Sequence, residues 1–191
     1  MRVYLAGPEV FLPDALEVAA AKKRICAAHG LEGVFPLDPP PAAPPAERPY
    51  WMRIYLGNEA HIRSCQALIA NLTPFRGPSA DVGTVYELGF MRALGRPVAG
   101  YSNAAAEFLA RTRGFLGGAA RSRADGGYED AEGMGLEDFG LGDNLMIDGG
   151  IEAAGGVFER RDAAGDRWRD LAGFERCCAW ISAGRARPGR E

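Results

Sequence analysis

The sequence predicts an α/β fold in which a parallel sheet is flanked by helices on both faces. Short β-prone runs alternate with longer segments of helical spacing over residues 2–101. Such alternation is typical of parallel sheets with right-handed crossovers. The run 67–72 (ALIANL) is apolar at every position but Asn71, as expected for a strand that is buried on both faces. The length of 191 residues suits one compact domain, which we expect to span 1–191.

The first two units of this alternation lie before the proline-rich stretch. Residues 2–6 predict a strand that ends at Gly7, and residues 14–29 have the apolar spacing of a helix that Gly30 stops. Residues 33–36 predict a second strand. The prolines of the following segment, LDPPPAAPPAERP, can continue neither a sheet ladder nor a helix, so they predict an extended surface loop.

The alternation continues with two more helices and two more strands. Residues 50–64 predict a helix, 67–72 a strand, 81–94 a helix that begins at Asp81, and 97–101 a strand.

The C-terminal part of the sequence is less regular. Residues 111–135 contain seven glycines and little apolar surface to offset the cost of ordering, so we expect a mobile loop there. Order should resume at 136–151, and the apolar spacing over 167–182 predicts a closing amphipathic helix.

Composition excludes several classes of function. The chain has 22 Lys and Arg against 25 Asp and Glu, and the basic residues are scattered, which argues against nucleic-acid binding. No apolar run approaches the roughly 20 residues that span a bilayer, and the N-terminus lacks the pattern of a signal peptide, so we expect a cytoplasmic protein without a membrane partner. The chain has only two histidines, His29 and His61, and its four cysteines have no CxxC spacing, so we expect no metal site.

The loops after the predicted strands contain the first candidate site residues. Ligands of open parallel sheets bind beyond the carboxyl ends of the strands. The first such loop, AGPEVF, contains Gly7, where a backbone can approach a ligand closely, and Phe11, on which a base could stack. A Gly-Pro sequence is also common in turns that bind nothing, and this alternative stays open.

A stronger signal is the segment PSADVGTVYELGF. A helix begins at Asp81, so Gly83 lies in its first turn, where free N–H groups can receive an anion or a hydroxyl. Glu87 follows Asp81 by six residues, so the two carboxylates lie on different helix faces unless Asp81 belongs to the loop. The alternative is that Asp81 is only an N-cap and Glu87 a solvated surface acid.

Four other residues are candidates with equally plain alternatives. Tyr4 lies in the middle of the first strand and could be a core aromatic. Asn58 interrupts a helical pattern in which Asn is mildly unfavourable, and it could be a buried amide bonded to backbone. Asn144 and Met146, in DNLMI, could be a helix cap followed by a core residue.

Four segments together resemble the nucleoside 2-deoxyribosyltransferase family, in the same order along the chain. They are VYLAGPEVF (3–11), GNEAHIRSCQALIANLTPFRG (57–77), DVGTVYELGF (81–90) and FGLGDNLMIDGGI (139–151). The resemblance implies a flavodoxin-like subunit that exchanges free nucleobases on 2′-deoxyribonucleosides through a covalent deoxyribosyl-enzyme.

The resemblance also implies roles for individual residues. Glu87 matches the nucleophilic carboxylate, Tyr4 the hydroxyl that orients it, and Asp81 and Asn58 side chains that contact the base or the sugar. Some members have Asp where this chain has Asn58, and a neutral amide cannot give the base a proton, so Asp81 or solvent becomes the candidate donor. Gln66 is a second departure, because many relatives have an acid there.

The segment around Asn144 and Met146 matches one that reaches into a neighbouring subunit's site in the family. This implies a homo-oligomer with shared sites. The apolar residues of 50–64, among them Trp51 and Ile54, point the same way, because they exceed what one helix face usually buries within a subunit.

The chemistry fits these residues without a cofactor. Displacing a base from C1′ passes through an oxocarbenium-like state that an ionised carboxylate stabilises and then traps. We expect Glu87 to be ionised at neutral pH, with the Tyr4 hydroxyl favouring its charged form.

Two alternative functions stay open. A nucleoside or deoxynucleoside 5′-monophosphate N-glycosidase would need a serine cradle or a basic cluster, which Arg76 and Ser79 leave possible. A non-catalytic nucleotide-binding module would have little use for Tyr4, Asp81 and Glu87 together.

Overall fold

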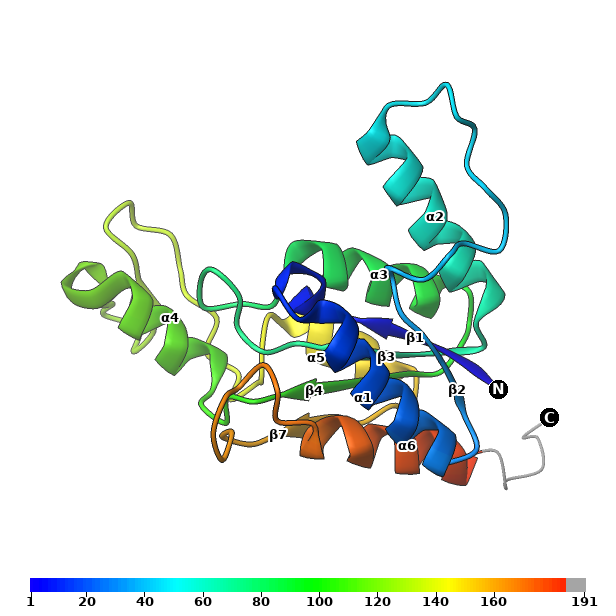
Figure 1. Ribbon diagram of the computed structural model, residues 1–191. Helices are drawn as coiled ribbons and strands as arrows, with labels where there is room; N and C mark the ends of the chain where they lie inside the picture. The colour runs from blue at the N-terminus through cyan, green and yellow to red at the C-terminus, as the bar shows by residue number, and fades with distance from the viewer. Residues whose placement is uncertain (185–191) are drawn as a thin grey trace.

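The computed structural model describes residues 1–184 and contains a five-stranded parallel sheet with helices on both faces (Figure 1). The strand order is β2-β1-β3-β4-β7, which confirms the predicted fold class. The strands of this sheet are β1 (Arg2–Ala6), β2 (Glu32–Val34), β3 (Ala67–Asn71), β4 (Val98–Ser102) and β7 (Phe158–Arg160). The helices are α1 (Ala15–Ala28), α2 (Tyr50–Ser64), α3 (Val82–Ala93), α4 (Phe108–Leu116), α5 (Leu145–Ala153) and α6 (Ala172–Gly184).

Two apolar clusters form the core, one on each face of the sheet. Helices α1 and α6 cover one face, and α2, α3 and α5 cover the other (Figure 1). All five residues of β3 and of β4 are buried, as predicted for central parallel strands. The N-terminal half of α2 projects away from the sheet beside the proline-rich loop, which contains no helix or strand (Figure 1).

Two features at the C-terminal end of the fold differ from the prediction. The edge strand β7 was not predicted, because a run of three residues that ends in two charged ones carries no clear period. Gly156 lets it pair with β4, since a Cβ there would lie 2.1 Å from the carbonyl oxygen of Val98. The closing helix begins at Ala172, later than predicted, because Asp170 accepts a hydrogen bond from the Ala172 N–H (3.0 Å).

Residues 111–135 have regular structure where a loop was expected. Helix α4 continues to Leu116 and is followed by a 3-10 turn, η2 (Gly117–Ala119), and by a hairpin of β5 (Arg121–Ser122) and β6 (Tyr128–Glu129). Arginines order this arm: Arg111 donates to the carbonyl of Gly142 (2.7 Å), and the Arg113 guanidinium lies 4.2 Å from the centre of the Tyr128 ring. Composition did not predict this order, because polar contacts rather than buried apolar area hold the arm formed by residues 111–135. The mobility of the arm stays a prediction.

Over residues 1–184, no helix has the length and apolar character needed to cross a bilayer.

Candidate functional site

A cavity of about 280 Å³ opens at the carboxyl ends of β2, β1 and β3, which are neighbours in the sheet. The loops after these three strands and the facing side of α2 form its walls, as the strand order requires for a parallel sheet. Six of the predicted site residues line this cavity: Gly7, Phe11, Asn58, Asp81, Gly83 and Glu87.

Glu87 lies in the second turn of α3 and is partly buried. Its Oε1 accepts a hydrogen bond from the hydroxyl of Tyr4 at 2.7 Å, and the amide Nδ2 of Asn58 lies 3.5 Å from the same oxygen. Tyr4 is fully buried in β1, where it pairs with Leu68 of β3, so the sheet fixes the position of its hydroxyl. Glu87 is therefore not a solvated surface acid, and Tyr4 is a core aromatic whose hydroxyl reaches the site.

The electrostatics of Glu87 differ from the expectation of a fully ionised group. Burial raises its pKa to about 7, the Tyr4 hydrogen bond lowers it, and the nearby Asp81 carboxylate raises it. How little water reaches this carboxylate depends on residues distant along the chain, so no local pattern could predict it. At neutral pH, then, Glu87 is divided between its protonated and ionised forms.

Asp81 is both an N-cap and a cavity residue. Its Oδ2 accepts from the backbone N–H of Thr84 (2.9 Å) and from the Thr84 hydroxyl (3.0 Å), which confirms the capping alternative. As the cap residue it has extended φ and ψ angles and precedes the helix. This is why it reaches the same cavity as Glu87 despite the six-residue spacing. A Cβ at Gly83 would lie 3.1 Å from Asp81 Oδ2, so glycine keeps this first turn uncrowded.

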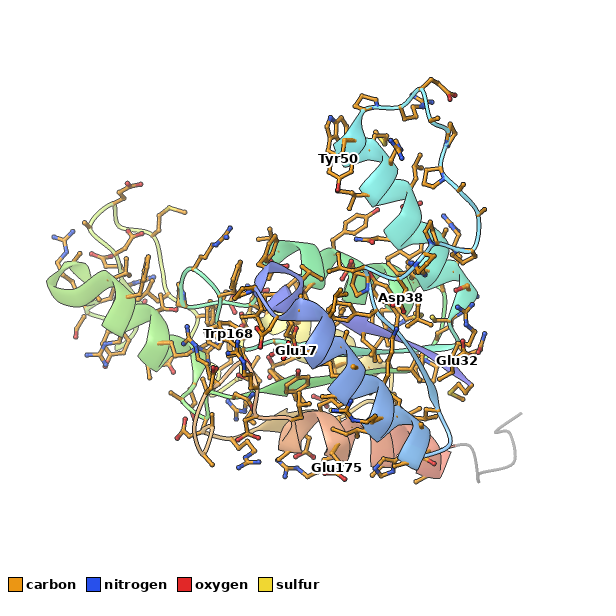
Figure 2. All side chains as sticks on the ribbon, in the orientation of Figure 1. Glu17, Glu32, Asp38, Tyr50, Trp168 and Glu175 are labelled. Atoms are coloured by element: carbon orange, nitrogen blue, oxygen red, sulfur yellow. The ribbon has the colours of Figure 1, made fainter. Side chains whose placement is uncertain are left out.

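Phe11 forms the aromatic wall of the cavity at the end of the 3-10 turn η1 (Pro8–Phe11). It is 59% exposed, and its ring stacks on Phe75 with centres 5.5 Å apart. The Arg76 guanidinium lies 5.2 Å from the centre of the Phe11 ring. Trp168, labelled in Figure 2, packs edge-on against Phe75. The loops after β1 and β3 thus hold Phe11 in place.

A buried polar cluster that the sequence did not predict lies behind this loop. Glu9 and Lys22 are fully buried and form an ion pair, and Glu9 Oε1 also accepts from Asn71 (2.9 Å) and Tyr101 (2.9 Å). A Cβ at Gly7 would lie 2.0 Å from Glu9 Oε2, so the turn needs glycine there. The available signal was the position of Lys22 on the apolar stripe of α1, where a solvated lysine is not expected.

Asn144 and Met146 lie away from the Glu87 cavity. Asn144 caps α5 by accepting from the Met146 N–H (3.1 Å), as the plain alternative holds, but Met146 is 74% exposed and is not a core residue. Both line a separate hollow of about 360 Å³ beside α3. Their contribution to a neighbouring subunit's site stays a prediction.

Ser79, one of the two residues that could form a phosphate cradle, is already engaged within the fold. The Ser79 hydroxyl donates to Asp143, whose other oxygen accepts from the Ala80 N–H (3.0 Å). Arg76 lies over the rings of Phe75 and Phe11. Within residues 1–184, no group of three or more His, Cys, Asp and Glu side chains has an arrangement that could hold a metal ion.

Comparison with known proteins identifies the family. The family model described as nucleoside 2-deoxyribosyltransferase matches residues 3–146. An uncharacterized protein of Schizosaccharomyces pombe is 34% identical over 187 residues, which cover 89% of this chain and 88% of the relative. The structure of a 2-desoxiribosyltransferase from Leishmania mexicana superposes with a TM-score of 0.61 at 25% identity, covering 95% of this chain and 97% of the other.

A conserved protein from Enterococcus faecalis V583 shares the fold, with a TM-score of 0.51 at 19% identity over 90% of this chain and 96% of the other. The family match covers the strands and helices that carry Tyr4, Asn58, Asp81 and Glu87. This chain therefore belongs to the nucleoside 2-deoxyribosyltransferase family.

Proposed function

We propose that this protein transfers the 2-deoxyribosyl group between nucleobases of 2′-deoxyribonucleosides through a covalent intermediate on Glu87. The observation that carries the proposal is the Glu87 carboxylate, which lines the cavity while the Tyr4 hydroxyl holds one of its oxygens at 2.7 Å. Membership of the family supports the reaction class.

The reaction consists of two displacements at C1′. In the first, a Glu87 oxygen bonds to C1′ as the bond from C1′ to the base nitrogen breaks, and the base leaves with that electron pair and takes up a proton. In the second, a nitrogen of the incoming base bonds to C1′, the ester bond to Glu87 breaks, and that base loses its proton. Two inversions give retention.

The neighbouring side chains orient this chemistry. Tyr4 fixes one carboxylate oxygen, and the Asn58 amide lies beside the same oxygen, where it can contact the base or the sugar. The Asn58 amide is not acidic enough to protonate the leaving base, so the base takes its proton from Asp81 or from solvent. A planar base can stack on Phe11, whereas water cannot, so the Phe11 ring favours attack by a base over attack by water.

The ratio of transfer to hydrolysis tests the proposal. Without added base, a deoxynucleoside should slowly release free 2-deoxyribose, and adenine should suppress this release as exchanged nucleoside forms. A ribonucleoside should be a much poorer donor, because its 2′-hydroxyl destabilises the oxocarbenium-like state. Fast release of 2-deoxyribose at a rate that does not depend on adenine would favour the N-glycosidase. An absence of turnover with any deoxynucleoside would favour the non-catalytic binding module.

The activity should depend on pH through Glu87. Because burial raises the pKa of this nucleophile to about 7, kcat/KM should rise with pH and level off above that value. Tyr4→Phe removes a hydrogen bond that lowers the pKa of Glu87, so the midpoint should move upward by roughly one unit. The pH dependence of kcat/KM for both proteins measures this shift. Unchanged midpoints would mean that Tyr4 does not tune Glu87.

We also propose a homo-oligomer, at least a dimer, in which subunits share sites. Val82 on α3 and Met146 on α5 are 84% and 74% exposed, beside the hollow that holds Asn144. With Val85 and Ile147 they line one apolar hollow, and a contiguous exposed apolar patch marks an interaction surface. Met146→Asp should shift the mass measured by light scattering toward a monomer and lower activity together. A fully active wild-type monomer would contradict shared sites.

A further inference from the structure

A second cavity, of about 260 Å³, adjoins the Glu87 cavity under the proline-rich loop. It extends along α2 from the first cavity toward the start of that helix. The two cavities share four lining residues, so they form one continuous cleft: Pro36, Leu37, Ile54 and Asn58.

The roof of the second cavity is held in place by one aspartate. The Asp38 backbone oxygen lies 3.0 Å from His61 Nε2, and its carboxylate bonds Lys23 (2.6 Å) and the Phe35 N–H (2.9 Å). Figure 2 shows Asp38 where the loop meets the sheet end of α2, with Tyr50 at the far end of the helix. Prolines in the loop have few conformations to lose, so the cavity is preformed rather than made by the ligand.

The walls of this cavity suit an uncharged group. Pro40 and Pro44 from the loop, with Ile54 and Leu37, provide carbon surfaces. The polar groups of Asp38 are already engaged in holding the loop. An apolar or aromatic ligand group would remove these surfaces from water. Arg53 and His61 also line the cavity, and the Arg53 side chain is exposed, so its guanidinium can stay in water when such a group binds.

We propose that the second cavity binds an apolar or aromatic substituent carried on the exocyclic amino group of a purine. This inference rests on the proposed function, which places C1′ of the sugar at Glu87. Asn58 lines both cavities and lies 3.5 Å from the Glu87 carboxylate, so a group that extends from C1′ past Asn58 enters the second cavity. In a purine joined to C1′ through N9, the exocyclic amino group is on the far edge of the base, so a substituent on it extends furthest from Glu87.

Gly57 offers a way to close the second cavity alone. It lines that cavity but not the first, and a Cβ there would meet Pro40 at 3.7 Å, an ordinary contact distance. Gly57→Leu should therefore fill the space, whereas Gly57→Ala should leave most of it open. Both replacements favour the helix by up to about 1 kcal/mol, so α2 should fold in each variant.

The experiment compares adenine and N6-benzyladenine as acceptors in wild type and both variants. Wild type and Gly57→Ala should use both bases, and Gly57→Leu should lose roughly tenfold or more in kcat/KM for N6-benzyladenine while adenine changes little. Equal loss for both bases, or rejection of N6-benzyladenine by the wild type, would overturn the proposal. So would a selective loss with a 5′-O-benzyl donor, because the sugar end would then occupy the cavity.

Calorimetric binding of the free bases separates this proposal from the proposed reaction. N6-benzyladenine should bind the wild type at least as tightly as adenine does and should bind Gly57→Leu more weakly. That result supports the second cavity even if no deoxynucleoside turns over. Adenine binding with exclusion of the substituted base refutes the cavity even if transfer is observed.

Discussion

Glu87→Gln is expected to abolish transfer while making the protein more stable above neutral pH. An amide of the same shape cannot form the ester to C1′, so activity should fall by roughly 10⁴-fold or more. Mass spectrometry of the wild type with a slow substrate should show a deoxyribosyl adduct on the peptide that contains Glu87. An adduct elsewhere, or an active Gln variant, would contradict the mechanism.

The gain in stability follows from the raised pKa of Glu87. Burial moves the pKa from 4.5 to about 7, so between these values the folded protein binds more protons than the unfolded chain. Stability contributed by the protonated form is therefore present below pH 4.5 and is lost as pH rises toward 7. The full shift corresponds to about 3 kcal/mol in the free energy of unfolding. The Glu87→Gln variant should therefore be more stable than the wild type at pH 8 and nearly as stable at pH 4.

A matched control is Glu59 on α2. Its carboxylate accepts hydrogen bonds from Tyr55 (2.6 Å) and Tyr86 (3.1 Å), and the first of these is the main reason that its pKa is lowered. Glu59→Gln should therefore lose a little stability at pH 8, the opposite sign from Glu87→Gln. Urea unfolding at pH 4 and pH 8 measures both. If both variants lost stability at pH 8, Glu87 would have a packing role.

The sheet could be predicted because its strands are short apolar runs separated by clear helical periods. Every residue of ALIANL is buried in the structure, either within the central strand β3 or directly after it. A run of this length and composition is typical of such a strand. The edge strand β7 lacks this signal, since its pairing depends on Gly156 approaching the backbone of β4. The order of the arm at 111–135 depends on individual arginine contacts, which composition does not record.

The meeting of three loops in one cavity was predictable, but the electrostatics of that cavity and the position of Asn144 and Met146 outside it were not. The order of the parallel strands brings the loops after β1, β2 and β3 together, so Gly7, Asp81 and Glu87 meet in one cavity. The spacing of Asp81 and Glu87 left their convergence open, and the extended conformation of the cap residue settled it. The pKa of Glu87 depends on burial by residues distant in sequence, which no local pattern contains.

Lys22→Met is expected to destabilise the protein by about 3 kcal/mol or more, because it leaves the Glu9 carboxylate buried without its cation. The Lys22 ammonium also lies 5.5 Å and 5.2 Å from the ring centres of Tyr101 and Phe174, and methionine replaces the packing of the side chain but not this charge. An exposed ion pair would cost no more than about 1 kcal/mol. Urea unfolding of both proteins at pH 7 distinguishes these magnitudes.

The double variant Glu9→Gln/Lys22→Met separates the lost charge balance from lost packing. Glutamine keeps an oxygen that can accept from Asn71 and Tyr101 but carries no charge to leave unpaired. The double variant should therefore be more stable than Lys22→Met alone, although it contains one more substitution. Because Glu9 sits against Gly7 in the turn that carries Phe11, Lys22→Met should also favour hydrolysis over transfer. A double variant no more stable than the single one would show that packing around Lys22, not the buried pair, holds this turn.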